Sequence, residues 1–251
     1  MKILSAMLFA MLITLAGCSD QSDNAFGESG KTNAQYVLAF SWQPAFCETA
    51  PKKQECKSQT STRYDATNFS LHGLWPQPGS NIYCGVSDAE IAMDKKGRWR
   101  DLSTGRINES VWRDLKRVMP GTQSSLHKHE WAKHGTCSPA GLDEYYTQSI
   151  WILEEINGSK LQDLFEANIG KEVSGNAIRA AFEDSFGAGA GDRLRISCKR
   201  DRDSGRQMIV EITLGLADPF EKNADLTALI AAAPATDPGC PSGVVDPAGF
   251  Q

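Results

Sequence analysis

Four stretches of the chain have the apolar pattern of β-strands. Residues 35–43 are rich in β-branched and aromatic side chains, and a shorter run of the same kind precedes the turn at Trp75–Pro76. Two later runs alternate between apolar and polar positions, and the polar residues 201–205 between them predict a hairpin turn. The predicted strands are therefore 35–43, 69–74, 193–198 and 207–214.

The middle of the chain has the periodicity of helices. Residues 110–119 carry apolar side chains at helical spacing, and Pro120–Gly121 ends this helix. Residues 76–108 are rich in Gly, Asp and Asn, and we expect a loop there with one short helix. Strands at both ends with helices between them favour an α+β fold, in which a central antiparallel sheet packs with several helices. The other predicted helices cover 124–135, 141–157, 159–168 and 174–186.

The N-terminus has the pattern of an export signal. Met1–Lys2 is followed by an apolar run from Ile3 to Leu15. This run is too short to cross a bilayer core of ~30 Å and is typical of a signal peptide. We therefore expect residues 1–17 to be a signal peptide and the protein to be exported.

A cysteine directly after this signal suggests a lipid anchor. The sequence Leu-Ala-Gly-Cys at 15–18 resembles the lipobox of bacterial lipoproteins, in which the cysteine is lipidated and becomes the new N-terminus. The alternative is ordinary cleavage nearby, with no role for Cys18. Ser19 follows, and in two-membrane bacteria a residue other than Asp there directs a lipoprotein to the outer membrane. Residues 18–33 are then the lipidated cysteine and a flexible tether. We expect an outer-membrane lipoprotein or a periplasmic or extracellular protein.

The remaining cysteines and the charge describe a single exported domain. Six cysteines remain when Cys18 is set aside, and an even number in an exported protein implies disulfides, with fifteen possible pairings. Zinc is the alternative, but no Cys-x-x-Cys pair exists. No repeat or second linker interrupts residues 34–251, which predict one domain. The net charge of −5 disfavours a protein that tracks long nucleic acid, but allows an enzyme that grips one or two nucleotides.

Histidine is concentrated where proton transfer is plausible. Three of the four histidines lie within eight residues, and the fourth, His72, lies where a predicted strand meets a turn. On a helix Glu130 and His134 share a face, with Lys133 beside them. A zinc protease needs His-Glu-x-x-His, and here His129 is one residue too far from His134. An acid and a base facing one substrate are the more fitting interpretation.

Two motifs resemble the active-site segments of the ribonuclease T2 family. They are His-Gly-Leu-Trp-Pro at 72–76 and His-Glu-Trp-Ala-Lys-His-Gly-Thr-Cys at 129–137. Ser-Trp-Gln-Pro at 41–44, followed by Cys47, resembles the family's first strand and turn. The resemblance implies an endoribonuclease of broad base tolerance that needs no metal or other cofactor. RNA would be the substrate because DNA lacks the attacking 2′-hydroxyl.

The resemblance also implies roles for individual residues. His134 would be the general base, His72 the general acid, and the product a 2′,3′-cyclic phosphate. Glu130 and Lys133 would stabilise the transition state, and His129 would bind the phosphate. By position Trp75 and Tyr83 would form one base site, with Gln43 near the other; Trp75 could equally be a core residue. His127 receives no role. The implied disulfides are Cys47–Cys56, Cys84–Cys137 and Cys198–Cys240.

Two interpretations without nuclease activity remain open. The domain could be an inactive member of the same fold that binds RNA or protein, although His72, Glu130 and His134 are all present. It could also be a metal-binding lipoprotein that uses the three clustered histidines, a reading that their spacing disfavours. For the nuclease, as for these alternatives, we expect a monomer that meets the membrane only through an N-terminal lipid.

Overall fold

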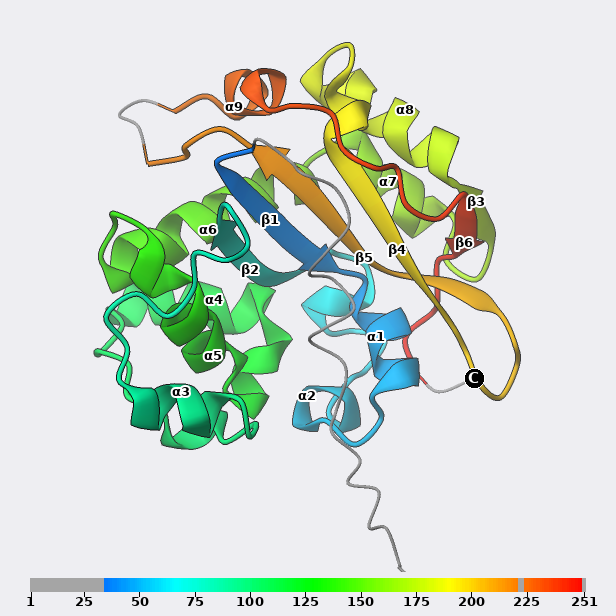
Figure 1. Ribbon diagram of the computed structural model, residues 1–251. Helices are drawn as coiled ribbons and strands as arrows, with labels where there is room; N and C mark the ends of the chain where they lie inside the picture. The colour runs from blue at the N-terminus through cyan, green and yellow to red at the C-terminus, as the bar shows by residue number, and fades with distance from the viewer. Residues whose placement is uncertain (1–33, 221–223, 250–251) are drawn as a thin grey trace, which may run out of the picture.

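The computed structural model describes residues 34–220 and 224–249 of the chain. In this part six strands form one sheet in the order β2-β1-β5-β6-β3, and β4 also pairs with β5 (Figure 1). The predicted signal peptide, Cys18 and the tether lie outside the described residues. The strands are β1 (Tyr36–Ser41), β2 (Ser70–Pro76), β3 (Glu172–Ser174), β4 (Leu194–Arg200), β5 (Gln207–Leu216) and β6 (Ser242–Val244).

Antiparallel pairing dominates this sheet, as the sequence predicts. β1 pairs with β2 and with β5, and β5 pairs with β4, all in the antiparallel sense. The short β6 departs from this pattern, because it joins β5 in the parallel sense through Met208 and Val244. The hairpin predicted at 201–205 is confirmed between β4 and β5. The expected α+β class is therefore confirmed.

Nine α-helices surround the sheet within the described residues. Four long helices match the predicted ranges, and the fifth, expected over 124–135, is shorter. Ser125 has φ 66°, a left-handed conformation that separates a 3₁₀ turn at Pro120–Ser124 from the helix that follows. The helices are α1 (Gln43–Thr49), α2 (Gln54–Lys57), α3 (Asp88–Asp94), α4 (Glu109–Val118), α5 (Leu126–Lys133), α6 (Leu142–Asn157), α7 (Lys160–Ala167), α8 (Gly175–Phe186) and α9 (Leu226–Ala232).

An aromatic cluster ties the first strand to the helical part of the core. Phe40, Trp42, Phe69 and Phe165 are fully buried. Phe69 makes edge-on contacts with the other three at ring-centroid distances of 5.1, 5.5 and 4.6 Å. These contacts fix β1 and the start of β2 against α7. No helix of the described residues is long and apolar enough to cross a membrane.

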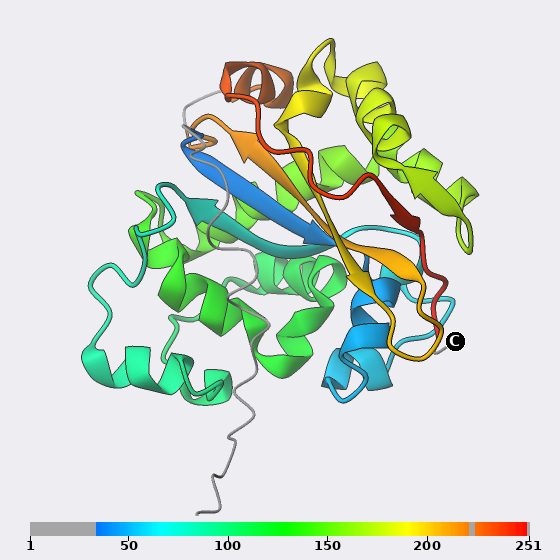
Figure 2. The same cartoon turned by 45° about the vertical axis from the view of Figure 1, so that its right-hand side comes forward.

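The helices that carry the candidate site pack on one part of the sheet. In both views α3, α4 and α5 lie together below β1 and β2, away from α8 and α9 (Figures 1 and 2). α5 and α6 contact β2 directly, and α3 contacts α5. The two motifs at 72–76 and 129–137, far apart in the sequence, therefore face each other across the contact between β2 and α5.

Three disulfides fasten the loops around this arrangement. Cys47–Cys56 joins α1 to α2, and Cys198–Cys240 joins β4 to the C-terminal segment. Cys84–Cys137 ties the loop after β2 to the 3₁₀ turn after α5. These are the three pairs that the family resemblance implies. The last one connects the two candidate site segments covalently.

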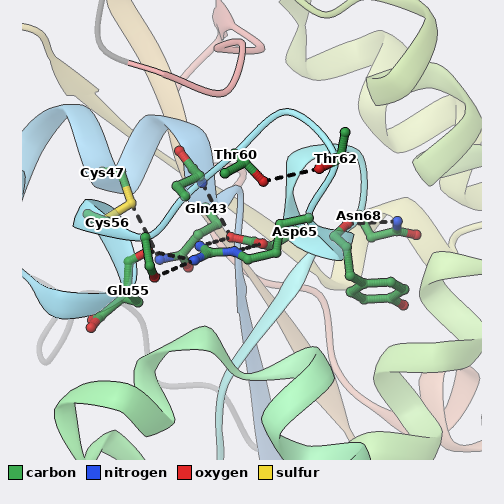
Figure 3. Close-up of polar contacts among 12 residues, drawn as sticks. Gln43, Cys47, Glu55, Cys56, Thr60, Thr62, Asp65 and Asn68 are labelled. Atoms are coloured by element: carbon green, nitrogen blue, oxygen red, sulfur yellow. Dashed lines mark hydrogen bonds and ion pairs between the residues drawn. A yellow bond between two sulfur atoms is a disulfide. The ribbon is translucent and has the colours of Figure 1, made fainter.

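The chain entering β2 is held by a buried carboxylate. Asp65 accepts a hydrogen bond of 2.6 Å from Nη2 of Arg63, and Nη1 of Arg63 donates to the carbonyl oxygen of Glu55 at 2.8 Å. Figure 3 shows this network beside the Cys47–Cys56 disulfide. Because Asp65 is buried, the ion pair anchors the segment between α2 and β2. It thereby fixes the strand that carries His72.

Candidate active site

His72 lies at an irregularity of β2. Ala39 pairs with Gly73 and Phe40 with Leu71, so His72 is the extra residue of a β-bulge. A bulge re-aims a side chain at the edge of regular pairing. The imidazole Nδ1 lies 2.6 Å from Oε2 of Glu211, and Nε2 lies 3.5 Å from Oε1 of Glu130. Both ring nitrogens of His72 therefore face carboxylates.

Glu130 is the buried centre of the site. Its side chain is only 1% exposed, and Oε2 accepts a hydrogen bond of 2.8 Å from the indole nitrogen of Trp75. Gly73 makes this approach possible, because a Cβ at that position would lie 1.9 Å from Oε2 of Glu130. The glycine of the first motif thus leaves room for the glutamate of the second.

His134 follows the last turn of α5 and is buried beside Trp75. The two rings have centroids 5.4 Å apart, and Nδ1 of His134 has no hydrogen-bond partner among the described residues. Burial, and then the positive charge of Lys133, lower the pKa of His134 to about 2. The imidazole is therefore neutral in the free protein at any ordinary pH, as a proton acceptor must be.

His129 is held by a third carboxylate. Its Nδ1 lies 2.7 Å from Oδ1 of Asp94, which also receives the hydroxyl of Tyr83 on Oδ2 at 2.7 Å. The indole of Trp99 stacks on the imidazole with centroids 4.6 Å apart. Nε2 of His129 lies 3.8 Å from Oε1 of Glu130. Glu130 therefore lies between His72 and His129, and the Tyr83 hydroxyl is engaged by Asp94.

A cavity of about 530 Å³ opens beside His72 on the side of Glu211. Basic side chains contribute to its walls, namely Lys52, Lys53, Lys199 and Arg202. Gln43 also lines this cavity, although its amide nitrogen is directed at Sγ of Cys47, 3.6 Å away. The half-buried Lys133 lies at the end of α5, next to His134. The site is therefore flanked by positive charge, although the whole chain is acidic.

The clustered histidines do not converge on a common point. His127 is buried against Trp112, with ring centroids 4.8 Å apart, and lines a separate cavity. His129 contacts Asp94, and His134 lies beside Trp75. No group of three potential metal ligands occurs within residues 34–220 and 224–249. The structure thus brings together His72, Glu130, His129 and His134, and leaves His127 outside the site.

Sequence reasoning missed Asp94, Trp99 and Glu211. Asp94 and Trp99 lie in the stretch interpreted mainly as loop, where polar residues are common. Glu211 was detectable in principle, because it interrupts the apolar residues of a strand whose neighbours Val210 and Ile212 are buried. A buried carboxylate in a strand needs a partner, and that requirement pointed to a functional contact.

Comparison with known proteins agrees with the two motifs. A family model described as the ribonuclease T2 family matches residues 33–228. Ribonuclease I of Escherichia coli (strain K12) is 29% identical over 186 residues, which cover 66% of this chain and 69% of that protein. Ribonuclease 1 of Arabidopsis thaliana is 28% identical over 221 residues, covering 85% and 87% of the two chains.

The fold agrees as well. A crystal structure of a mutant of RNase MC1 in complex with 5′-UMP aligns with a TM-score of 0.52 at 20% sequence identity. The alignment covers 72% of this chain and 88% of that chain. This likeness shows a shared architecture, and the family model covers most of the described residues. The chain therefore belongs to the ribonuclease T2 family, a family of endoribonucleases.

Proposed function

We propose that this protein cleaves RNA by transphosphorylation, with His134 as general base and His72 as general acid. The observation that carries the proposal is the convergence of both histidines on Trp75, whose ring centroid lies 5.3 Å from His72 and 5.4 Å from His134. Glu130 joins the group through the Trp75 indole and through Nε2 of His72. Family membership supports the same reaction class.

The chemistry needs one proton acceptor and one proton donor. Neutral His134 takes the proton of a ribose 2′-hydroxyl, and the 2′-oxygen attacks the adjacent phosphorus. The bond from phosphorus to the 5′-oxygen breaks, and protonated His72 gives its proton to that oxygen. The products are a 2′,3′-cyclic phosphate and a free 5′-hydroxyl. Water then converts the cyclic phosphate to a 3′-phosphate when the two histidines exchange roles.

The substrate itself would adjust His134 to this task. In the free protein burial and neighbouring cations hold its pKa at about 2. A phosphodiester beside the ring adds a negative charge, and an opposite charge favours the protonated imidazole. The pKa of His134 would rise on binding, so the base would gain proton affinity only when RNA is present.

The other site residues are assigned to charge and orientation. We assign stabilisation of the pentacovalent transition state to Glu130 and Lys133, and phosphate binding to His129. The cationic Lys133 would offset the negative charge that grows on the phosphoryl oxygens. Trp75 and Tyr83 are proposed for one base site and Gln43 for the other. Stacking on aromatic rings tolerates every base, which supports broad base tolerance.

Export fits the covalent structure of the domain. Three disulfides within one domain are typical of oxidising compartments outside the cytosol. We propose that residues 1–17 direct export and that Cys18 carries a lipid. Residues 34–251 would form a single catalytic domain. The protein would then act as a monomer at the outer membrane, or in the periplasm or outside the cell if the lipid is absent.

Purified protein lacking residues 1–18 tests the reaction class. It is incubated in excess EDTA with RNA and with DNA of the same sequence, at pH 5 and pH 7, and the product ends are identified by mass. Cleavage of RNA to 2′,3′-cyclic phosphates with intact DNA is expected. A folded, disulfide-bonded sample that cleaves neither polymer would contradict the proposal and favour an inactive binding protein.

A further inference from the structure

A second buried carboxylate contacts the proposed general acid from β5. Oε2 of Glu211 lies 2.6 Å from Nδ1 of His72. The two residues are 139 positions apart in the chain, and β1 separates their strands in the sheet. A contact across the intervening strand β1 requires a short side chain on β1 between His72 and Glu211.

Ser41 is the residue of β1 that meets this requirement. It pairs with Ser70 of β2 on one side and with Glu211 of β5 on the other. Strands in a sheet lie ~4.8 Å apart, so side chains on β2 and β5 must bridge about 10 Å. The short Ser41 side chain leaves the space above β1 open, and its hydroxyl lies 3.5 Å from Oε2 of Glu211. The bulge at His72 helps to bring the imidazole within reach.

The environment of Glu211 calls for a cationic partner. The residue is 4% exposed, and Oε1 has no hydrogen-bond partner among the described residues. A buried carboxylate is costly unless a positive group pairs with it. Among the described residues, Glu211 forms its ion pair with His72.

Other charged groups also face His72. Oε1 of Glu130 approaches Nε2 of His72 from α5 at 3.5 Å, whereas His134 at the end of the same helix is neutral. The cavity that His72 borders carries the basic residues Lys52, Lys53, Lys199 and Arg202. These cations oppose protonation of the imidazole, whereas the two carboxylates favour it. The closest of all these contacts is the one with Glu211.

We propose that Glu211 is a positioning residue that keeps His72 protonated and points its Nε2 at the leaving 5′-oxygen. The inference rests on the proposed function, in which His72 is the general acid. A carboxylate that accepts the Nδ1 proton fixes the tautomer and orientation of an imidazole and stabilises its cationic form. Glu211 would therefore act through His72 and would not touch RNA.

The test uses Glu211→Gln, which keeps the shape of the side chain and removes its charge. We expect kcat to fall about ten- to a hundredfold, with KM changed less than about threefold. We also expect the alkaline limb of the pH–rate profile to move to lower pH, because His72 loses its proton more readily. Glu172→Gln, an exposed strand residue outside the site, is the matched control and should leave both quantities unchanged.

A second measurement does not depend on activity. The four histidines give few imidazole signals in NMR, and a His72→Gln variant identifies the signal of His72. In wild type its titration midpoint is expected above the ordinary value of about 6.5, and Glu211→Gln should lower it. A wild-type midpoint at or below the ordinary value overturns the inference, as does an unchanged rate and titration in a folded variant. A protein that cleaves no RNA but shows the expected titration would overturn only the proposed function.

Discussion

Oδ1 of Asp94 lies 2.7 Å from Nδ1 of His129, while Trp99 stacks on the same imidazole. The aspartate therefore orients the ring and offers a negative charge to its protonated form. We expect Asp94→Asn to raise KM for RNA about tenfold and to lower kcat less, because His129 is assigned to phosphate binding. Steady-state kinetics on a defined oligonucleotide measures both constants.

A surface aspartate provides the control for that variant. Asp101 is half exposed and forms an ion pair with Arg98 outside the site, so Asp101→Asn should leave KM and kcat unchanged. An Asp94→Asn protein with wild-type KM would show that His129 needs no charged partner. It would also weaken the assignment of His129 to the phosphate.

The two proposed proton-transfer residues give the largest expected effects. His72→Ala and His134→Ala should each lower kcat by about 10²- to 10⁴-fold, the usual contribution of a general acid or base. Both variants are expected to stay folded, because neither ring belongs to the apolar core. Circular dichroism and the melting temperature check the fold, and cyclic-phosphate formation measures the rate. Near-wild-type rates in both variants would refute the two-histidine mechanism.

Gly73 offers a test of the contact between the two motifs. A Cβ at this position would lie 1.9 Å from Oε2 of Glu130 and 2.6 Å from the indole nitrogen of Trp75. Gly73→Ala should therefore break the hydrogen bond between these side chains, lower activity at least tenfold and cost about 1–3 kcal/mol of stability. Gly79→Ala is the matched control, since a Cβ there meets no atom within 4 Å. Equal activities of the two variants would contradict the role given to this close approach.

Only some of the helices and strands could be predicted from the sequence alone. The strands β1, β2, β4 and β5 and the long helices were predictable because their apolar periodicity is local. The short elements α1, α2, β3 and β6 were not, because a few residues carry too weak a pattern. α9, which was also missed, lies in a segment rich in Ala and Pro where no polar face marks a helix.

The residues of the candidate site also differ in whether the sequence predicts them. The histidines and Glu130 were predictable because they lie in two compact motifs. Their carboxylate partners were not, because Asp94 and Glu211 come from separate parts of the chain and meet the histidines only through the sheet and through the packing of α3 on α5. The contact of His72 with Glu211 across β1 depends on the strand register and on the bulge in β2. Neither can be recognised from a local pattern of residues.

His127 makes the stability of the fold depend on pH. Burial against Trp112 lowers its pKa from 6.5 to about 4. Between these values the unfolded chain binds a proton that the folded chain does not, so stability is complete above about pH 6.5 and is lost as the pH falls. At pH 5 this group lowers the free energy of unfolding by ~2 kcal/mol relative to its value above pH 6.5. His134, with its pKa lowered to about 2, acts in the same direction.

The variant His127→Phe isolates this effect. It keeps an aromatic ring beside Trp112 and removes the titrating group, so the loss of stability between pH 7.5 and pH 5 should shrink by ~2 kcal/mol. Urea unfolding at the two pH values, in wild type and variant, measures the difference. The same pH dependence in both proteins would show that His127 does not carry the effect.

The Cys84–Cys137 disulfide closes the segment that contains most of the site. Its cysteines are 53 residues apart and enclose α3, α4 and α5, which carry Asp94, His129 and Glu130. Replacing both cysteines by alanine should cost ~2–4 kcal/mol and also lower activity, because the backbone N–H of Tyr83 donates to the carbonyl oxygen of Lys133 at 2.9 Å beside this link.

The Cys198–Cys240 pair is the matched comparison for this loss. It spans 42 residues and joins β4 to the C-terminal segment, so its removal should cost a similar amount of stability. The rate per folded molecule should remain higher than in the Cys84/Cys137 variant, because the loop after β2 and the 3₁₀ turn after α5 keep their covalent link. Thermal unfolding gives the stability of each double variant, and initial rates well below the melting temperature give the activity. If both variants lost activity equally, the Cys84–Cys137 link would act on global stability alone and not on the alignment of α5 with β2.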